Sequence, residues 1–456
     1  MENAIDLWKR LEGSDGLIPA WVDGDKVRTV RFSNTVAREL SRLITQSIDI
    51  KVENERGTTD TSNAIQSALD TAFLQKSQDV MEKAIRLGGV MAKWNGDGID
   101  YLTPDRFLVT DYDSNGVITG AIFFSQYHEG RTVYTRAEYH RYRKDADGLK
   151  AYQISNRAFK SDSDGSIGSE VSLLSTRWAD IQPETTISSL EKPLFVYLKN
   201  PFSNTIDPDS PLGVSIFSEC IEELRWLDIA MSTMGTEVEE SAPIMFVDSS
   251  AVQFAKENHI ILPKFIKGMQ MGISPESTIQ QWQPALQTES RKEAINFYLS
   301  IISYKCGFDA GYFVFNGQTI EAATATQVEA TERRTVNTVL AFRNLLDRPN
   351  TNGDGRVGFV QDIAYIINAM QAANGQILPR EYGNYALYCD FADLTQNAEE
   401  EKAFDYQLTQ NGYMSKVRFL VRNLGLTEQE AQEMVQEARA EMQEAAQAAG
   451  ALFEGA

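Results

Sequence analysis

The sequence has few of the features that cross-link a chain or anchor it to a membrane. It contains three cysteines in 456 residues, Cys220, Cys306 and Cys389, and no CxxC pair. This spacing excludes a disulfide framework and favours a reducing cytoplasm. No apolar run approaches the roughly 18 residues needed to span a bilayer, and the acidic start has no signal-peptide core. We therefore expect a soluble protein, made inside the cell, with no membrane partner.

The motifs of common enzyme classes are also absent from the sequence. There is no glycine-rich loop ending in Gly-Lys-Ser/Thr, no GxSxG elbow and no HExxH pair. The three histidines, His128, His140 and His259, are too scattered to suggest a metal or catalytic site. The sequence therefore predicts that the protein is not an enzyme.

Positive charge is scarce. The chain has 43 Lys and Arg against 64 Asp and Glu, a formal charge of -21, and a pI near 4.7. Such a field argues against a DNA-binding protein that reads sequence through a basic patch. A solvated acidic surface that serves only solubility is the alternative. Glu237, Glu239 and Glu240 could suggest a two-metal nuclease, but they close a long predicted helix, where a solvated or interface face is the commoner reason.

The residues that are present predict an α+β protein. A content of 42% hydrophobic and 10% aromatic residues is typical of a folded chain, and the length predicts two to four structural units. Periodicity predicts helices over most of the first 90 residues, including one that opens at Asp60 and ends at Gly88. A β-meander follows over residues 90–159. Further strands are expected at 48–52, 194–198 and 385–389, a helix at 359–373, and helices over most of the tail from Asn397.

The middle of the chain predicts two long helices joined by a small module. Ser210-Pro211 is a helix-start signal, and an apolar stripe runs from Phe217 to Val238. Two strands are expected in the module, at 244–247 and 260–262. A second helix is expected over residues 288–306, and a third over 326–346, opened by the capping box Thr326-Gln-Val-Glu329.

Two local patterns resemble calcium-binding loops. In residues 350–361, oxygen ligands are offered by Asn350, Asn352 and Asp354, with glycine at the sixth position. The twelfth position is Gln361, which cannot supply a bidentate carboxylate, although Asp362 could partly substitute. We expect at most weak Ca²⁺ binding, and the competing interpretation is a turn that ends a helix. The second pattern, residues 111–118, lies within strand periodicity and is better explained as a hairpin turn.

The order of these elements, together with several short motifs, resembles the portal proteins of tailed bacteriophages, especially long-tailed phages of Gram-positive bacteria. The residues that carry the resemblance are 134–140, Ser155-Asn156, 207–213, 317–331, 389–393, Asn411-Gly412, Ser415-Lys416 and 426–431. It covers nearly the whole chain, although each motif alone is weak.

The resemblance implies the portal fold. That fold has an α/β wing at 1–205, a first stem helix at 206–241, a small α/β clip at 242–287 and a second stem helix at 288–306. A tunnel loop and helix follow at 307–346, a wing return at 347–395 and a helical crown at 396–456. The residues implied to face DNA in the tunnel are Gln318, Thr319, Glu321, Thr324 and Gln327. Those implied to bind partners on the clip are Lys264 and Lys267.

The resemblance also implies a function. Portal subunits form a ring, usually of about twelve copies, at one vertex of the capsid, and double-stranded DNA passes through it without sequence-specific contacts. The implied partners are the large terminase subunit, a head–tail adaptor, and the major capsid and scaffold proteins. The ring would be assembled in the host cytoplasm and remain in the virion, with no cofactor. An acidic binding module with a degenerate calcium loop at 350–361 is the alternative.

Overall fold

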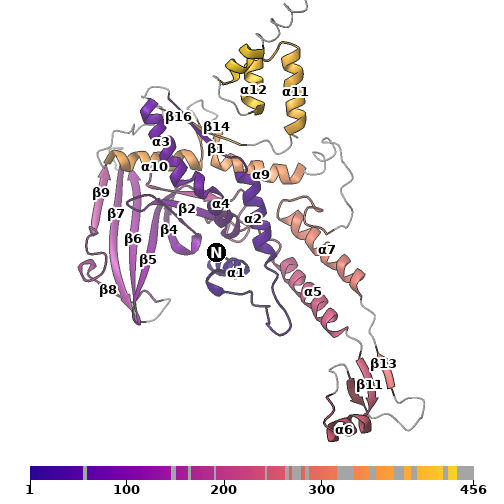
Figure 1. Cartoon of the computed structure of the whole chain (residues 1–456). Coiled ribbons are helices and arrows are strands. Elements are labelled where there is room, and N and C mark those ends of the chain that lie inside the picture. The colour runs from indigo at the N-terminus through magenta and orange to yellow at the C-terminus, as the bar shows by residue number, and fades with distance from the viewer. Residues whose placement is uncertain are drawn as a thin grey trace, which may run out of the picture. The chain divides into compact units, whose positions relative to one another are not determined.

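The fold is α+β and is taken from a computed structural model of the chain (Figure 1). The residues that the structure describes are 1–54, 59–144, 150–162, 166–188, 190, 192–241, 244–261, 266–269, 279–282, 287–315, 333–349, 356–373, 385–391, 398–424 and 430–438. They belong to two compact units. The first comprises Met1–Gln318 and Glu332–Ala392, and the second comprises Thr319–Thr331 and Asp393–Ala456.

The first unit begins with four helices: α1 (Glu2–Glu12), α2 (Phe32–Thr45), α3 (Thr59–Ala72) and α4 (Ser77–Leu87). The predicted helix from Asp60 to Gly88 is wrong in one respect, because a 3₁₀ turn at Leu74–Lys76 divides it into α3 and α4. Its inward positions are confirmed: Ile65, Leu69, Phe73, Val80, Ala84 and Leu87 are buried. Phe73 lies at the interruption between α3 and α4 and packs edge-on against Phe359. Burial of this ring therefore accompanies the interruption of the helix.

The predicted meander is confirmed, but it forms two sheets. One has the order β10-β2-β3, and the other has the order β4-β5-β6-β7-β8, with β9 also paired to β7. The strands are β2 (Gly89–Trp94), β3 (Ile99–Leu102), β4 (Phe107–Tyr112), β5 (Ile118–Glu129), β6 (Thr132–Lys144), β7 (Lys150–Ser161), β8 (Ser169–Val171), β9 (Glu184–Ser188) and β10 (Phe195–Lys199). The hairpin turn between β4 and β5 is also confirmed, since Asp113 Oδ1 accepts hydrogen bonds from the amides of Asn115 and Val117, each at 2.9 Å.

A long-range strand pair closes the first unit. Strand β1 (Asp49–Asn54) pairs antiparallel with β16 (Tyr385–Asp390). Helix α10 (Phe359–Ala373) has the bounds that the sequence predicts, and it contacts α3 and β10. Helix α9 (Arg333–Leu346) leads to the short strands β14 (Arg348–Pro349) and β15 (Arg356–Val357). Both strands of the long-range pair are predicted from the sequence, whereas their pairing is not.

The approach to the first long helix differs from its prediction. Helix α5 (Ile221–Glu240) begins eleven residues after Ser210, so the predicted start at Ser210-Pro211 is wrong. The intervening segment instead docks in irregular conformation on the end of α4, where the amide of Ile216 donates to the carbonyl of Ile85. A Cβ atom added at Gly213 would lie 2.1 Å from the carbonyl oxygen of Gly88. Tertiary contacts therefore override the local helix signal.

A small module follows α5 in the chain. Its sheet has the order β12-β11-β13, with β11 (Ile244–Asp248) parallel to β12 (Ile266–Met269) and antiparallel to β13 (Ile279–Trp282). Helix α6 (Ser249–Glu257), which the sequence analysis missed, joins β11 to the following segment and contacts both β11 and β12. The strand predicted at 260–262 is wrong, since residues 260 and 261 have no regular structure.

Helix α7 (Thr288–Lys305) then runs antiparallel to α5 and ends before Gly307, which has φ +81°. The predicted second helix is therefore confirmed. The third predicted helix is confirmed from Arg333 onward as α9, and its capping box at 326–329 lies outside the described residues.

The described part of the second unit is helical. It contains α11 (Ala398–Gln410), α12 (Lys416–Leu424) and a helix at residues 430–438. Asp405 on α11 is buried and accepts hydrogen bonds from Arg422 and Asn423 on α12, at 3.3 Å and 3.0 Å. Among the described helices of both units, none has the length and apolar character needed to cross a membrane.

Candidate functional site

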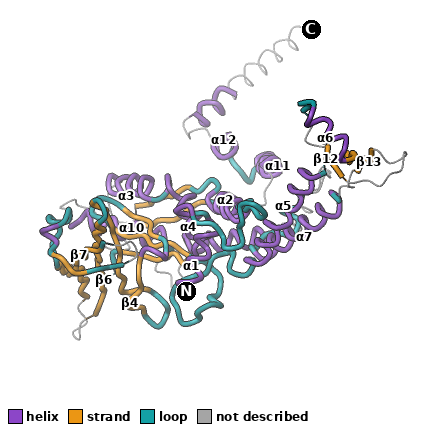
Figure 2. The backbone as a smooth tube through the Cα atoms, turned by 90° about the horizontal axis from the view of Figure 1, so that it is seen from below, coloured by secondary structure: helices purple, strands orange, loops and turns teal. Residues whose placement is uncertain are grey.

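Helices α5 and α7 form a hairpin that is fastened at both ends by ion pairs. They lie side by side in both views (Figures 1 and 2). Near the start of α5, Glu223 accepts a hydrogen bond from Lys305 Nζ at 2.7 Å. At the opposite end, Glu237 pairs with Arg291 and accepts a hydrogen bond from the amide of Gln287 at 2.7 Å. The Gln287 amide and the Arg291 guanidinium lower the pKa of Glu237.

Two thiols are in contact at the root of the hairpin, which is the end where α5 begins and α7 ends. Cys220 is the residue before α5, Cys306 follows α7, and their sulfur atoms are 3.6 Å apart with both side chains buried. The hydrogen bond with Cys220, together with burial, raises the pKa of Cys306. These cysteines are 86 positions apart in the sequence, so nothing in their local sequence predicts the contact.

The buried side of α5 is held by the N-terminal region. The buried carboxylate of Asp228 accepts hydrogen bonds from Trp21 Nε1 at 3.0 Å and from the amide of Val30 at 2.9 Å. One turn later, Ser232 Oγ accepts a hydrogen bond from the amide of Arg28 at 2.9 Å. These contacts fix α5 to the segment that connects α1 and α2.

Two faces of the hairpin expose aromatic side chains. Leu224, Leu227 and Asp228 are buried on one side of α5, and helical geometry places Trp226, 46% exposed, on the other side. On α7, Phe297 and Tyr304 are 61% and 55% exposed. They are seven residues apart and lie opposite the buried side of α7, which is formed by Ile295, Leu299, Ile302 and Ser303. The hairpin therefore has an aromatic outer face on each helix.

The charges of these elements differ in sign. Helix α5 carries one arginine and six carboxylates: Glu222, Glu223, Asp228, Glu237, Glu239 and Glu240. Helix α9, whose first turn lies beside the end of α7, begins with Arg333 and Arg334 and contains no acidic residue. Glu223 and Glu237 pair with cations of α7 and Asp228 is buried, so Glu222, Glu239 and Glu240 give α5 its exposed negative charge. Arg333 and Arg334 are exposed at the start of α9.

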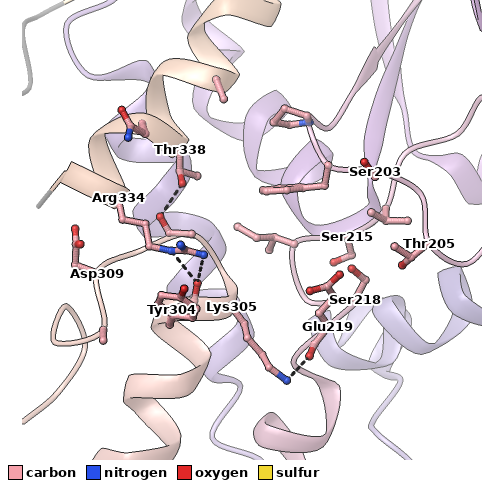
Figure 3. A pocket seen from close by; sticks show the side chains of 18 of the residues that line it. Ser203, Thr205, Ser215, Ser218, Glu219, Tyr304, Lys305, Asp309, Arg334 and Thr338 are labelled. Carbon is pink, nitrogen blue, oxygen red and sulfur yellow. Dashed lines mark hydrogen bonds between the residues drawn. The ribbon is translucent and has the colours of Figure 1, made fainter.

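A polar pocket of about 890 Å³ lies where α7 and α9 meet the segment before α5 (Figure 3). Arg334 stacks over the Tyr304 ring at 3.9 Å and donates two hydrogen bonds to the carbonyl of Tyr304. Lys305 donates to the carbonyl of Glu219 at 2.8 Å, and Thr338 donates to that of Gly307 at 2.7 Å. The lining combines the cations Lys305, Arg333 and Arg334 with the carboxylates Glu219 and Asp309, several hydroxyl groups and apolar side chains, so it indicates no single class of ligand.

Most of the site residues expected from the sequence lie outside the described residues. These are Gln318, Thr319, Glu321, Thr324, Gln327, Lys264, Asn350, Asn352 and Asp354. Lys267 lies on β12, opposite Phe246 of β11, and its side chain is outside the description. The tunnel and clip assignments therefore remain predictions.

The described end of the candidate calcium loop is occupied by internal contacts. Gln361 Nε2 donates to the buried carboxylate of Asp347 at 2.6 Å and to the carbonyl of Leu387 at 3.3 Å. Asp362 accepts a hydrogen bond from Lys192 Nζ at 2.5 Å. Throughout the described ranges, no group of three or more His, Cys, Asp and Glu side chains is placed to hold a metal ion.

A buried polar network in the sheets was missed by the sequence analysis. Glu138 on β6 accepts hydrogen bonds from His140 Nε2 at 2.7 Å, from Lys93 Nζ at 2.5 Å and from Arg136 at 3.0 Å. The other nitrogen of His140 lies 2.5 Å from the hydroxyl of Tyr152. Burial favours the neutral form of Glu138, but the contacts with His140 and Lys93 outweigh it and lower its pKa to about 2. Burial lowers the pKa of His140.

This network has the residue types of an acid–base site, but its setting is structural. His140 is 2% exposed and stacks edge-on against Phe123 and Phe195. Burial along β6 does not alternate cleanly, since Val133, Thr135 and His140 are buried and residues 136–139 are all half-buried, so the strand pattern does not identify Glu138 and His140. Among the described residues, this network fastens the two sheets together, since Lys93 belongs to one sheet and Glu138 to the other.

No protein-family model and no curated protein sequence matches the chain. The chain is similar to one in a structure described as the virion of a native gene transfer agent particle. The identity is 11%, 93% of each chain is covered, and the TM-score is 0.44. It is also similar to a chain in the neck of an empty particle of that kind, with 12% identity, 88% and 91% coverage, and a TM-score of 0.38. Likeness at these scores does not establish a shared fold.

Proposed function

We propose that the chain is a non-enzymatic structural subunit that assembles into a closed ring, the portal of a phage capsid. The observation that carries the proposal is the α5–α7 hairpin, which exposes Trp226 on one outer face and Phe297 and Tyr304 on the other. Aromatic side chains are enriched in the buried cores of interfaces between subunits, so we expect these two faces to be covered in the assembled protein.

The two faces suit a head-to-tail interface. In a heterologous contact, one surface of a subunit meets a different surface of the next copy, and the arrangement closes into a ring when the rotation permits. The acidic α5 side would meet the side of the next copy that carries Arg333 and Arg334. Trp226 would then lie near the exposed aromatics of the neighbouring α7. The opposite charges orient the copies and disfavour a face-to-face dimer.

The hairpin also has suitable dimensions for a channel wall. Helix α5 has 20 residues and α7 has 18, so each is about 30 Å long at 1.5 Å per residue. This is shorter than the helix of about 30 residues that the sequence predicts, because α5 starts at Ile221. The net negative charge of the chain would let double-stranded DNA pass with few phosphate contacts.

Other parts of the proposed portal follow from the resemblance. Gln318, Thr319, Glu321, Thr324 and Gln327 would line the tunnel. The module at 242–287, with Lys264 and Lys267, would dock the large terminase subunit during packaging and the head–tail adaptor afterwards. Capsid and scaffold proteins would surround the ring of about twelve copies in the virion.

Negative-stain electron microscopy of the purified full chain, with and without capsid and scaffold proteins, tests the proposal. We expect rings with a central hole. The double variant Trp226→Ala and Phe297→Ala should reduce the ring fraction at least about tenfold, since buried aromatic anchors dominate such interfaces. The matched control is Leu174→Ala, because Leu174 is 79% exposed and lies between β8 and β9, outside the hairpin.

Failure to form rings even with the capsid and scaffold proteins would contradict the proposal. So would rings that form equally well from the double variant, since the hairpin faces would then not be the interface. A persistent monomer whose melting temperature rises with Ca²⁺ would favour the acidic binding module with the loop at 350–361.

A further inference from the structure

We propose that Cys220 and Cys306 are a modification site: a thiol pair that an oxidant of the peroxide class converts into a disulfide at the root of the α5–α7 hairpin. The inference is independent of ring formation, because it concerns two thiols of one chain. It extends the sequence analysis, which found no disulfide framework in the spacing of the three cysteines.

The sulfurs are already neighbours. They are 3.6 Å apart, and a disulfide bond is about 2.0 Å long, so an approach of about 1.5 Å is required. The Cys306 sulfur also lies 3.8 Å from the carbonyl oxygen of Ile216, within the range of a weak S–H···O hydrogen bond. Cys220 and Cys306 lie in the turns that flank α5 and α7, outside the helices, where side-chain rotation and small backbone shifts cost less than within a helix.

The pocket of Figure 3 lies beside the thiol pair. The walls of the polar pocket include Ile216 and Gly307, the first in contact with Cys306 Sγ and the second adjacent to Cys306 in the chain. Lys305, on the other side of Cys306, also lines this pocket. Both sulfurs are buried, so a small oxidant in this pocket would reach them through a local opening of the wall formed by Ile216 and Gly307.

The chemistry balances with hydrogen peroxide as the oxidant. One thiol loses its proton and attacks a peroxide oxygen, which breaks the O–O bond and gives a sulfenic acid and water once the proton is transferred. The second sulfur attacks the sulfenic sulfur, forms the S–S bond and releases a second water. Two thiols are oxidised by two electrons and one peroxide is reduced. The raised pKa of Cys306 keeps its thiol protonated at neutral pH, so the reaction should accelerate as the pH rises.

The product would close a covalent loop around the hairpin. Cys220 and Cys306 are 86 positions apart in the sequence, and the chain between them includes α5, the β11–β13 module and α7. The root of the hairpin would then be held by a covalent bond beside the Lys305–Glu223 ion pair. The reduced form suits a cytoplasmic protein, and the oxidised form would be reached only after exposure to an oxidising medium.

The test treats the reduced full-length protein with hydrogen peroxide under native conditions, alkylates the remaining thiols and maps the peptides. The expected product is one linked peptide pair containing Cys220 and Cys306, with Cys389 recovered as alkylated thiol. The melting temperature should rise by about 5 °C and return after reduction, since a cross-link restricts the unfolded chain.

Cys389→Ser, which alters the third cysteine on β16, should leave the linked pair unchanged, whereas Cys220→Ser and Cys306→Ser should abolish it. If either serine variant fails to fold, the peptide map of the wild-type chain still decides the matter. Recovery of Cys220 and Cys306 as free thiols or as separate sulfinic acids would overturn the proposal. Links to Cys389 formed as often as the Cys220–Cys306 link would also overturn it.

Discussion

Lys305, the last residue of α7, lies with its Nζ atom 2.7 Å from Oε1 of Glu223 in the first turn of α5. The same ammonium group donates to the carbonyl of Glu219, so one side chain joins the end of α7 to the approach of α5. The cation near the C-terminus of α7 and the carboxylate near the N-terminus of α5 each also suit the dipole of their own helix.

Substitution of Lys305 by Met should therefore lower the free energy of unfolding by about 1 kcal/mol, since the pair is partly exposed and such pairs contribute little. A double-mutant cycle with Glu223→Gln, followed by urea unfolding, measures the coupling. The coupling should shrink in high salt. A salt-independent coupling would mean that the methylene stem of Lys305, not its charge, stabilises the hairpin.

The contact between Gly88 and Gly213 predicts a larger effect. A Cβ atom at Gly213 would lie 2.1 Å from the Gly88 carbonyl oxygen, and Gly88 itself has φ +90°. Gly213→Ala should therefore cost at least about 2 kcal/mol through steric overlap. The matched control is Gly235→Ala in α5, where nothing lies within 4 Å of the added atom. That variant should stabilise the protein by about 0.5–1 kcal/mol, because alanine favours a helix over glycine. Equal effects in the two variants would contradict the packing of the segment before α5 on α4.

The Glu138 network predicts how stability depends on pH. Burial lowers the pKa of His140 below 6.5, so around and below this pH the unfolded chain binds a proton that the folded chain does not, and stability falls as the pH decreases. The pKa of Glu138 is lowered from 4.5 to about 2, so its contribution is present above pH 4.5 and is lost between pH 4.5 and about 2.

The urea concentration at the unfolding midpoint should therefore fall in two stages as the pH is lowered from about 7 to 2. His140→Gln should remove most of the first stage, whereas His128→Gln, at an exposed position on β5, should retain it. A first stage that persists in His140→Gln would assign it to another group.

A buried arginine predicts the last effect. Arg343 on α9 donates hydrogen bonds to the carbonyls of Leu43 and Ile44, at 2.9 Å and 3.1 Å, in the last turn of α2. Its guanidinium thus caps carbonyl groups that have no partner within their own helix. Arg343→Met should cost about 2–4 kcal/mol because these buried acceptors lose their donor. Arg333→Met, at an exposed position on the same helix, should change the stability of the isolated chain by less than about 0.5 kcal/mol. Thermal unfolding of both variants distinguishes the two positions.

Local patterns predicted much of the secondary structure. The spacing of Val80 and Ala84 identified a buried helix face, and the Asp113 turn identified a hairpin, because both signals lie within a few residues. The start of α5 could not be predicted in this way. Ser210-Pro211 has the local chemistry of a helix start, but Gly213 and Ile216 make long-range contacts with α4 that no local pattern contains.

The candidate site was predicted less completely than the fold. The hairpin follows from its periodicity, and Gly307 ends α7 where expected. The exposure of Trp226 and Phe297 does not follow from periodicity, because an apolar residue on a helix is usually expected in a core. The meeting of Cys220 with Cys306 depends on the antiparallel return of the chain after the small module, and so does the pairing of Glu237 with Arg291.

The pairing of β1 with β16 has a consequence for synthesis of the chain. Lys51 on β1 and Asp390 on β16, whose side chains form an ion pair, are 339 residues apart in the sequence. At about 5–20 residues per second, a ribosome needs roughly 20–70 s to make the intervening chain. Strand β1 has no partner strand during that interval. The first unit therefore cannot finish folding until nearly the whole protein has left the ribosome. Chains released early would expose an unpaired strand edge, and such edges promote aggregation.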